Sequence, residues 1–171
     1  MLPIFILAGA LILMLLVVFL PLPQHNKFAE SDDSEKPRRL NEQEQIAYSY
    51  SCVYNSLVLF ANSVDYLKSL SAPAFDPLFE IESEFDLGFS GYHLEKNFEN
   101  GTIKENMKPD LLDFKKHVLE IPSELWNYEA LESHEIWKKI RAQAGLLLDR
   151  IGETRREYNH EYTKIIGVNN K

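Results

Sequence analysis

The sequence predicts a mainly α protein, in which an N-terminal transmembrane helix precedes a small helical bundle. Residues 1–23 carry no charged side chain, and two later segments repeat apolar residues every three or four positions, which is helical spacing. Between these two segments, residues 74–109 are partly alternating and contain a favoured turn dipeptide. We therefore expect two long helices with heptad seams, a shorter helix, and a small β-hairpin unit in the middle.

Residues 1–23 form the predicted membrane helix. Nineteen of them are apolar, and about 20 such residues make a helix of roughly 30 Å, which is enough to cross a bilayer core. A cleaved signal peptide is the main alternative. No basic residue precedes the apolar run and no small-residue cleavage site follows it, so we interpret the segment as an uncleaved signal anchor that contacts the lipid bilayer.

Residues 24–40 form a predicted flexible tether. They hold four basic and four acidic residues and few apolar ones, a composition that cannot bury a core. All four basic residues follow the apolar span within a short distance, and none precedes it. Because Lys and Arg favour the cytoplasmic side, we expect a single-pass protein whose C-terminal domain is cytoplasmic rather than periplasmic or extracellular.

Residues 41–171 are predicted to be one helical domain, long enough to bury a core. Its first helix should cover about 42–70, where Asn41 and Glu44 resemble a capping box and Ala72-Pro73 ends the helix. The apolar residues of this segment follow steps of four and three, which is a heptad seam. The seam consists of Ile46, Tyr50, Val53, Leu57, Phe60, Val64 and Leu67.

The middle of the domain, residues 74–109, is predicted to be a mixture of β-structure and loop. From Phe79 to Phe89 the odd positions are mostly apolar and the even positions mostly acidic, which is the period of a half-buried strand. Asn100-Gly101 is a favoured two-residue hairpin turn. The alternative interpretation is an irregular loop whose aromatic side chains pack onto the bundle.

Two further helices are predicted after the middle region. One covers about 110–121, between Asp110, which can cap it, and Pro122, which ends it. The last covers about 133–166, where an apolar stripe runs from Trp137 to Tyr162 in steps of mostly three or four. The two long helices should pack antiparallel with the shorter one beside them. Alternatively, their seams face a second copy in a self-associating coiled coil.

The composition argues against several functional classes. The net charge of −8 and the lack of a basic cluster argue against nucleic-acid binding. A single cysteine excludes a disulfide framework and a Cys-rich zinc site, and Cys52 is expected to be a small residue near the helix seam. No nucleophile elbow or Gly-rich phosphate loop is present. We therefore predict a non-enzymatic protein without a cofactor.

The candidate contact region is the acidic and aromatic segment 75–94. Residues 41–110 carry twelve acidic and four basic side chains, so this part of the chain accounts for the whole net charge. On a strand, the acids would project to one side and could bind a basic protein. A solvated face or a weak divalent-cation site are the alternatives for the acids, and core packing is the alternative for the aromatics. The candidate residues are Glu80, Glu82, Glu84, Asp86, Phe79, Phe85, Phe89 and Tyr92.

A metal centre is a weaker hypothesis. Glu157 and His160 form an E-x-x-H pair, which would lie on one helical face, and His117 lies four residues after Asp113. A carboxylate-bridged bundle needs a second E-x-x-H, and the sequence has none. Solvated side chains on helix surfaces are the alternative interpretation.

Together these observations predict a membrane-anchored protein-binding domain, such as an adaptor, an inhibitor of the immunity-protein type or an assembly factor. The anchor would raise the local concentration of the domain at the bilayer. Two alternatives stay open, namely a membrane-bound carboxylate and histidine metal enzyme or sensor, and a homo-oligomeric coiled coil.

Overall fold

The computed structural model describes residues 39–73 and 75–161, and it confirms the mainly helical class. The predicted transmembrane helix at 1–23 and nearly all of the tether lie outside the described residues. Among the residues that are described, no helix combines the length and the apolar character needed to cross a bilayer. The elements are α2 (Glu42–Ala61), α3 (Val64–Ser69), α4 (Pro77–Gly88), α5 (Gly91–Glu99), the 3₁₀ turn η1 (Glu105–Met107), α6 (Lys108–Leu119), the 3₁₀ turn η2 (Ser123–Leu125), α7 (Tyr128–Ser133) and α8 (Glu135–Ile151).

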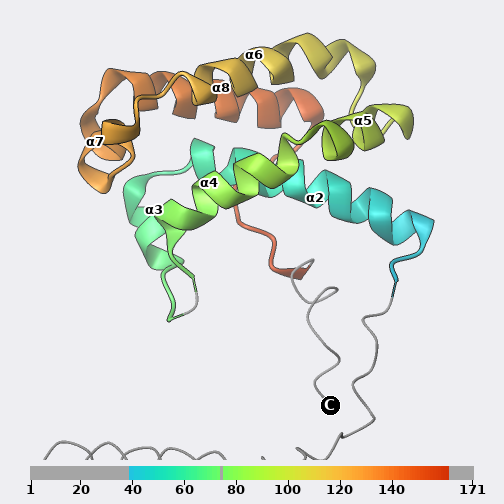
Figure 1. The fold of residues 1–171 in the computed structure, drawn as a ribbon, viewed down its shortest axis with the longest axis horizontal. Coiled ribbons are helices and arrows are strands. Elements are labelled where there is room, and N and C mark those ends of the chain that lie inside the picture. Colours follow the sequence, from blue (N-terminus) through green and yellow to red (C-terminus); the bar gives the residue numbers. More distant parts are fainter. Residues whose placement is uncertain (1–38, 74, 162–171) are drawn as a thin grey trace, which may run out of the picture. The chain divides into compact units, whose positions relative to one another are not determined.

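Helix α2 is the central element of the domain. It begins with the predicted capping box, in which Asn41 Oδ1 accepts from the Glu44 N–H at 3.0 Å and the Glu44 carboxylate accepts from the Asn41 N–H at 2.9 Å. Every residue from 51 to 60 is buried, because α4, α5 and α8 all pack against this helix. Figure 1 shows α6 and α8 running side by side, with α4 crossing α2. The heptad seam of α2 therefore packs inside the domain.

The single helix predicted over 42–70 is wrong, because the chain forms two helices there. Helix α2 ends at Ala61, and the extended backbone of Asn62 redirects the chain. Ser63 then caps α3, with its hydroxyl oxygen accepting from the Tyr66 N–H at 3.2 Å. Asn and Ser side chains offer the backbone local hydrogen bonds, so they favour a cap over an uninterrupted helix.

The strand and hairpin predicted within 74–109 are also wrong. Helix α4 begins where Asp76 caps it and Pro77 occupies the first turn, and α5 follows after two residues. The alternation was misleading because Ile81 and Phe85 are also spaced for a helix, and they face the core. The Asn100-Gly101 dipeptide ends α5 instead of turning a hairpin, with Gly101 at φ 67°. Within the described residues the only β-pairing is an isolated bridge between Ala72 and Phe75.

Helices α6 and α8 pack antiparallel. Arg150 contacts Asp110 at 2.7 Å, and Gln143 donates to Asp113 at 3.2 Å, so the end of one helix lies beside the start of the other. The prediction of α6 is close to the observed bounds, but Asp110 lies in the first turn and no side chain caps the helix. The helix predicted over 133–166 is too long. It ends at Ile151 because Gly152 adopts the left-handed conformation at φ 90°. The Glu153 N–H then donates to the Leu148 carbonyl at 2.9 Å, which closes the helix end.

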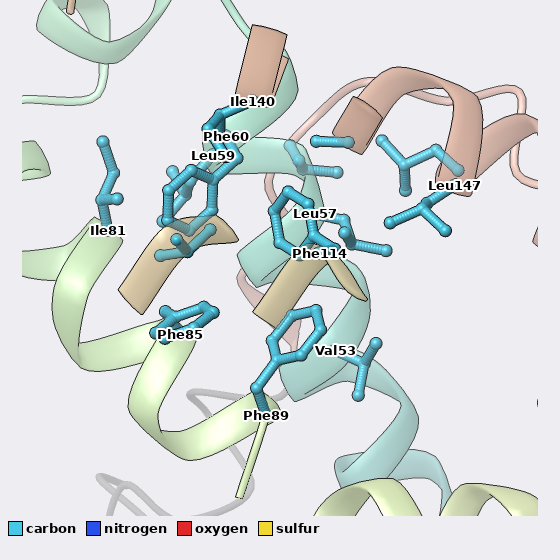
Figure 2. Close-up of a cluster of buried hydrophobic side chains, with 14 of the residues drawn as sticks. Val53, Leu57, Leu59, Phe60, Ile81, Phe85, Phe89, Phe114, Ile140 and Leu147 are labelled. Carbon is cyan, nitrogen blue, oxygen red and sulfur yellow. The ribbon is translucent and has the colours of Figure 1, made fainter. Parts of the chain in front are cut away.

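The aromatic core is organised around Phe60 of α2. Its ring centroid lies 5.7 Å from that of Phe85 in α4, 5.4 Å from that of Phe114 in α6 and 6.0 Å from that of Trp137 in α8. Figure 2 shows Phe85 of α4 and Phe89, which follows that helix, below Phe60 and Phe114. Rings at these separations gain attraction beyond their buried area, roughly 0.5–1.5 kcal/mol per pair. One side chain thus joins four helices.

Helices α2 and α4 approach each other most closely at Gly88. A Cβ atom added there would lie 2.5 Å from the Cys52 carbonyl oxygen and 3.0 Å from the Val53 nitrogen. Both are backbone atoms of α2, so no side chain can move aside. The close crossing therefore requires glycine at this position.

We predict that Gly88→Ala destabilises the domain, by about 1–3 kcal/mol, because the new methyl group forces the two helix backbones apart. Urea unfolding of the full chain, followed by circular dichroism, measures the change. The matched control is Gly145→Ala in the interior of α8, where an added Cβ meets nothing within 4 Å. That substitution should stabilise the chain by roughly 0.5–1 kcal/mol. Equal unfolding midpoints for the two variants would contradict the close approach.

Candidate functional site

The candidate contact region lies on α4 and the start of α5. Helix α4 buries Ile81, Phe85 and Gly88 against α2. With 3.6 residues per turn, the opposite side of the helix carries Phe79, Glu82, Ser83 and Asp86, all exposed, with the exposed Leu87 beside them. We call these five residues the outer face of α4.

The four acids of the region divide into two pairs, because α4 is a helix and not a strand. Glu82 and Asp86 lie on the outer face, in water. Glu80 and Glu84 lie on one flank and are partly covered. Burial, helped by the neighbouring charge of Asp76, raises the pKa of Glu80. The expected row of four carboxylates is therefore replaced by a pair on the outer face and a pair on the flank.

The four aromatics also divide. Phe85 and Phe89 are core residues, with ring centroids 5.1 Å apart. Phe79 is 65 % exposed on the outer face of α4, and Tyr92 is 60 % exposed on α5. The Tyr92 ring packs edge-on against His93 at 5.0 Å, which holds it in place. The core-packing interpretation is thus correct for Phe85 and Phe89, whereas Phe79 and Tyr92 are exposed and available for contact with a partner.

A buried polar contact joins α5 to α2, and the sequence analysis missed it. His93 Nδ1 and the Ser49 hydroxyl lie 2.9 Å apart, and Asn97 donates to the Ser49 carbonyl at 2.9 Å. Burial lowers the pKa of His93. Both Ser49 and His93 are buried, so a substrate has no access to the hydroxyl, and we interpret the contact as structural. The signal available in the sequence was the spacing of His93 and Asn97, four residues apart on one helical face.

Residues 153–160, which follow α8, form a segment outside any helix or strand that we call the strap. Four side chains of α2, α3 and the loop between them hold its main chain. Tyr54 donates to the Glu157 carbonyl at 2.8 Å, and Asn62 donates to the Arg156 carbonyl at 2.9 Å. The strap therefore covers one side of α2 that the helices leave open.

Tyr158 anchors the strap. It is buried, and its ring lies edge-on to Phe75 with centroids 5.5 Å apart. Its hydroxyl donates to the Glu84 carboxylate on the flank of α4. Burial raises the pKa of Glu84, while the hydrogen bond from Tyr158 opposes that shift.

Burial also raises the pKa of Cys52, which lies beneath this cluster, to about 12, so its thiol stays protonated and unreactive.

The candidate metal ligands do not gather at one place. Glu157 and His160 belong to the strap, which is not helical, so the expected E-x-x-H face does not form. His117 lies on α6, where its ring is 3.0 Å from the Gln143 side chain and 3.6 Å from Asp113. Throughout residues 39–73 and 75–161, no group of three or more His, Cys, Asp or Glu side chains is placed to hold a metal ion.

Neither family models, nor curated proteins, nor solved structures match this chain.

We predict that Glu84→Gln removes a pH dependence of stability. Because burial raises the pKa of Glu84 in the folded state, its stabilising contribution is complete below the unfolded pKa of about 4 and is lost as the pH rises through the folded value. Glutamine keeps an oxygen that accepts from Tyr158 but does not ionise. The wild-type chain should therefore lose stability relative to Glu84→Gln as the pH rises from about 4 to about 8.

Urea midpoints of both proteins across that pH range measure this effect. Glu82→Gln, two residues away on the outer face of the same helix, is the matched control. A stability difference between wild type and Glu84→Gln that is the same at every pH would refute the buried position of this carboxyl.

Proposed function

We propose that this protein is a non-enzymatic protein-binding domain held at a membrane, and that it contacts its partner through the outer face of α4 together with Tyr92. In this proposal, residues 1–23 anchor the chain, residues 24–40 form the tether, and the helical domain is on the cytoplasmic side. The partner is a protein with a basic contact surface. An adaptor, an inhibitor of the immunity-protein type and an assembly factor all belong to this class.

The exposure of Phe79 carries the proposal. A phenylalanine on the water side of a helix gains much less burial energy than its neighbours Ile81 and Phe85, so it contributes little to the stability of the isolated fold. Aromatic side chains are the usual anchors of protein interfaces, where they fill a pocket of the partner. Phe79 projects from a helix whose other side is fixed in the core, so it is presented with little loss of conformational entropy on binding.

The charges around Phe79 favour a basic partner. Glu82 and Asp86 are exposed on the same face, one and two turns further along α4. Carboxylates at the rim of an interface speed association with a basic surface and disfavour acidic partners. Attachment to a bilayer would confine the domain and its partner to the same surface, so a modest affinity suffices.

The test begins with affinity purification of the tagged full chain from native membranes after cross-linking, compared with two variants. Phe79→Ala removes the anchor, and the double variant Glu82→Lys with Asp86→Lys reverses the charge. We expect one protein to be recovered with the wild type and to be absent with both variants. Leu119→Ala is the matched control, because Leu119 on α6 is also 65 % exposed but lies on a different helix.

The recovered protein should then be purified and titrated against each form. Phe79→Ala should weaken binding by about thirtyfold, which corresponds to a hot spot of about 2 kcal/mol. The charge-reversed variant should bind more slowly, with a smaller effect at high salt. Equal affinity of the wild type, Phe79→Ala and the charge-reversed variant for that protein would refute the outer face of α4 as the contact surface.

A further inference from the structure

We propose that the groove which holds the strap is a binding site for an extended peptide, and that it accepts the strap of a second copy of this chain as well as its own. This site is separate from the outer face of α4, because it lies on α2, α3 and the flank of α4. The inference therefore does not depend on the proposed partner.

The groove recognises the main chain of the strap. Asn55 makes a matched pair of hydrogen bonds, donating to the Asn159 carbonyl at 3.1 Å and accepting from the Asn159 N–H at 2.9 Å. The Tyr66 hydroxyl accepts from the Tyr158 N–H at 2.6 Å. With the bonds from Tyr54 and Asn62, five hydrogen bonds run between side chains of the groove and backbone groups of four consecutive strap residues.

This arrangement is that of a peptide receptor. The helices supply rigid side-chain donors and acceptors, and the extended segment supplies its unpaired backbone groups, as in recognition of peptides by main-chain contacts. Asn55 is buried in α2, and the strap supplies both hydrogen-bond partners of its amide. Departure of the strap would replace these two bonds by bonds to water.

One side chain of the strap gives the site its specificity. Tyr158 is buried, with its ring against Phe75 and its hydroxyl on Glu84. An occupant without an aromatic ring and a hydroxyl at this position would leave the space unfilled and the carboxyl without its donor. The strap of a second copy carries the same tyrosine and the same main chain, so it makes every one of these groove contacts.

The junction between α8 and the strap allows an exchange. Gly152 is exposed at φ 90°, and a Cβ atom added there would meet nothing within 4 Å. Ile151, Thr154 and Tyr158 continue the apolar spacing of α8, so the released strap can extend that helix and carry Tyr158 away from its own groove. Release also breaks the hydrogen bonds from Arg156 to Asp149 and to the Gly145 carbonyl of α8. Segment exchange of this kind is a low-cost route to a dimer.

Two variants of the full chain test the exchange by complementation. Tyr158→Ala keeps the groove but has a defective strap, and Asn55→Ala keeps the strap but has a defective groove. Each alone should be monomeric in light scattering. Their mixture should form a dimer, in which the intact strap of Asn55→Ala displaces the weakened strap of Tyr158→Ala from its groove. Energy transfer between labels on the two variants reports the same pairing.

The double variant Asn55→Ala with Tyr158→Ala is the control, and it should pair with neither single variant. A mixture of the folded single variants that associates no more than each does alone would overturn the proposal. If circular dichroism shows that Asn55→Ala is unfolded, Tyr66→Phe replaces it, because that change removes only the hydroxyl that accepts from the Tyr158 N–H. Phe79→Ala introduced into both partners should leave the pairing intact, which separates this result from the proposed function.

Hydrogen exchange on the unaltered chain gives a second measurement. The N–H groups of Tyr158 and Asn159 donate to side chains of the groove, so they are freed whenever the strap leaves. We expect them to exchange about tenfold faster or more than buried amides of α2, since the strap opens without unfolding of the core. Equal rates would show that the strap leaves only on global unfolding, and would overturn the proposal.

Discussion

Ten consecutive residues of α2, from 51 to 60, are buried, and a helix buried on every side has to be covered by several other elements at once. Helices α4, α5 and α8 each cover part of it, and the strap covers another part. Each large apolar side chain on α2 contributes roughly 1.5–3 kcal/mol when it is buried. Because no one of these elements covers α2 on every side, the fold depends on all of them packing around the same helix.

Two polar residues of α2, Ser49 and Asn55, bind particular elements to this helix. An apolar surface attracts any apolar partner, but a buried amide or hydroxyl needs a specific hydrogen bond. Asn55 obtains both of its bonds from the strap, and the hydroxyl of Ser49 obtains its bond from α5. Gly88 adds a steric condition, because only α4 brings a glycine to the Cys52 carbonyl. The apolar seam of α2 thus supplies most of the stability, and a few polar or small residues select how the other elements pack against this helix.

The same residues explain which features were predictable from the sequence. Local signals were sufficient for the capping box at Asn41 and for the approximate bounds of α6, since both depend on neighbouring residues, although the cap expected from Asp110 is absent. The strand prediction for 79–89 failed because Phe79 and Leu87 are apolar residues that face water. Together with the buried Ile81 and Phe85, they produced the alternating pattern that is typical of a half-buried strand. The exposure of Phe79 could not be inferred, because the sequence alone does not distinguish an apolar residue that is buried in the core from one that lies on the surface. The strap was missed because its extended form depends on side chains about 100 residues away.

Helix α4 connects the two proposed surfaces while keeping them separable. Its core side is held by Phe85, Phe89 and the close approach of Gly88, and none of these contacts involves the strap. One flank receives the Tyr158 hydroxyl, and the outer face carries Phe79. If the strap leaves its groove, Glu84 loses its donor, but the core contacts that orient Phe79 remain. Exchange of the strap between copies is therefore compatible with a partner bound to the outer face, so that a dimer would present two such faces.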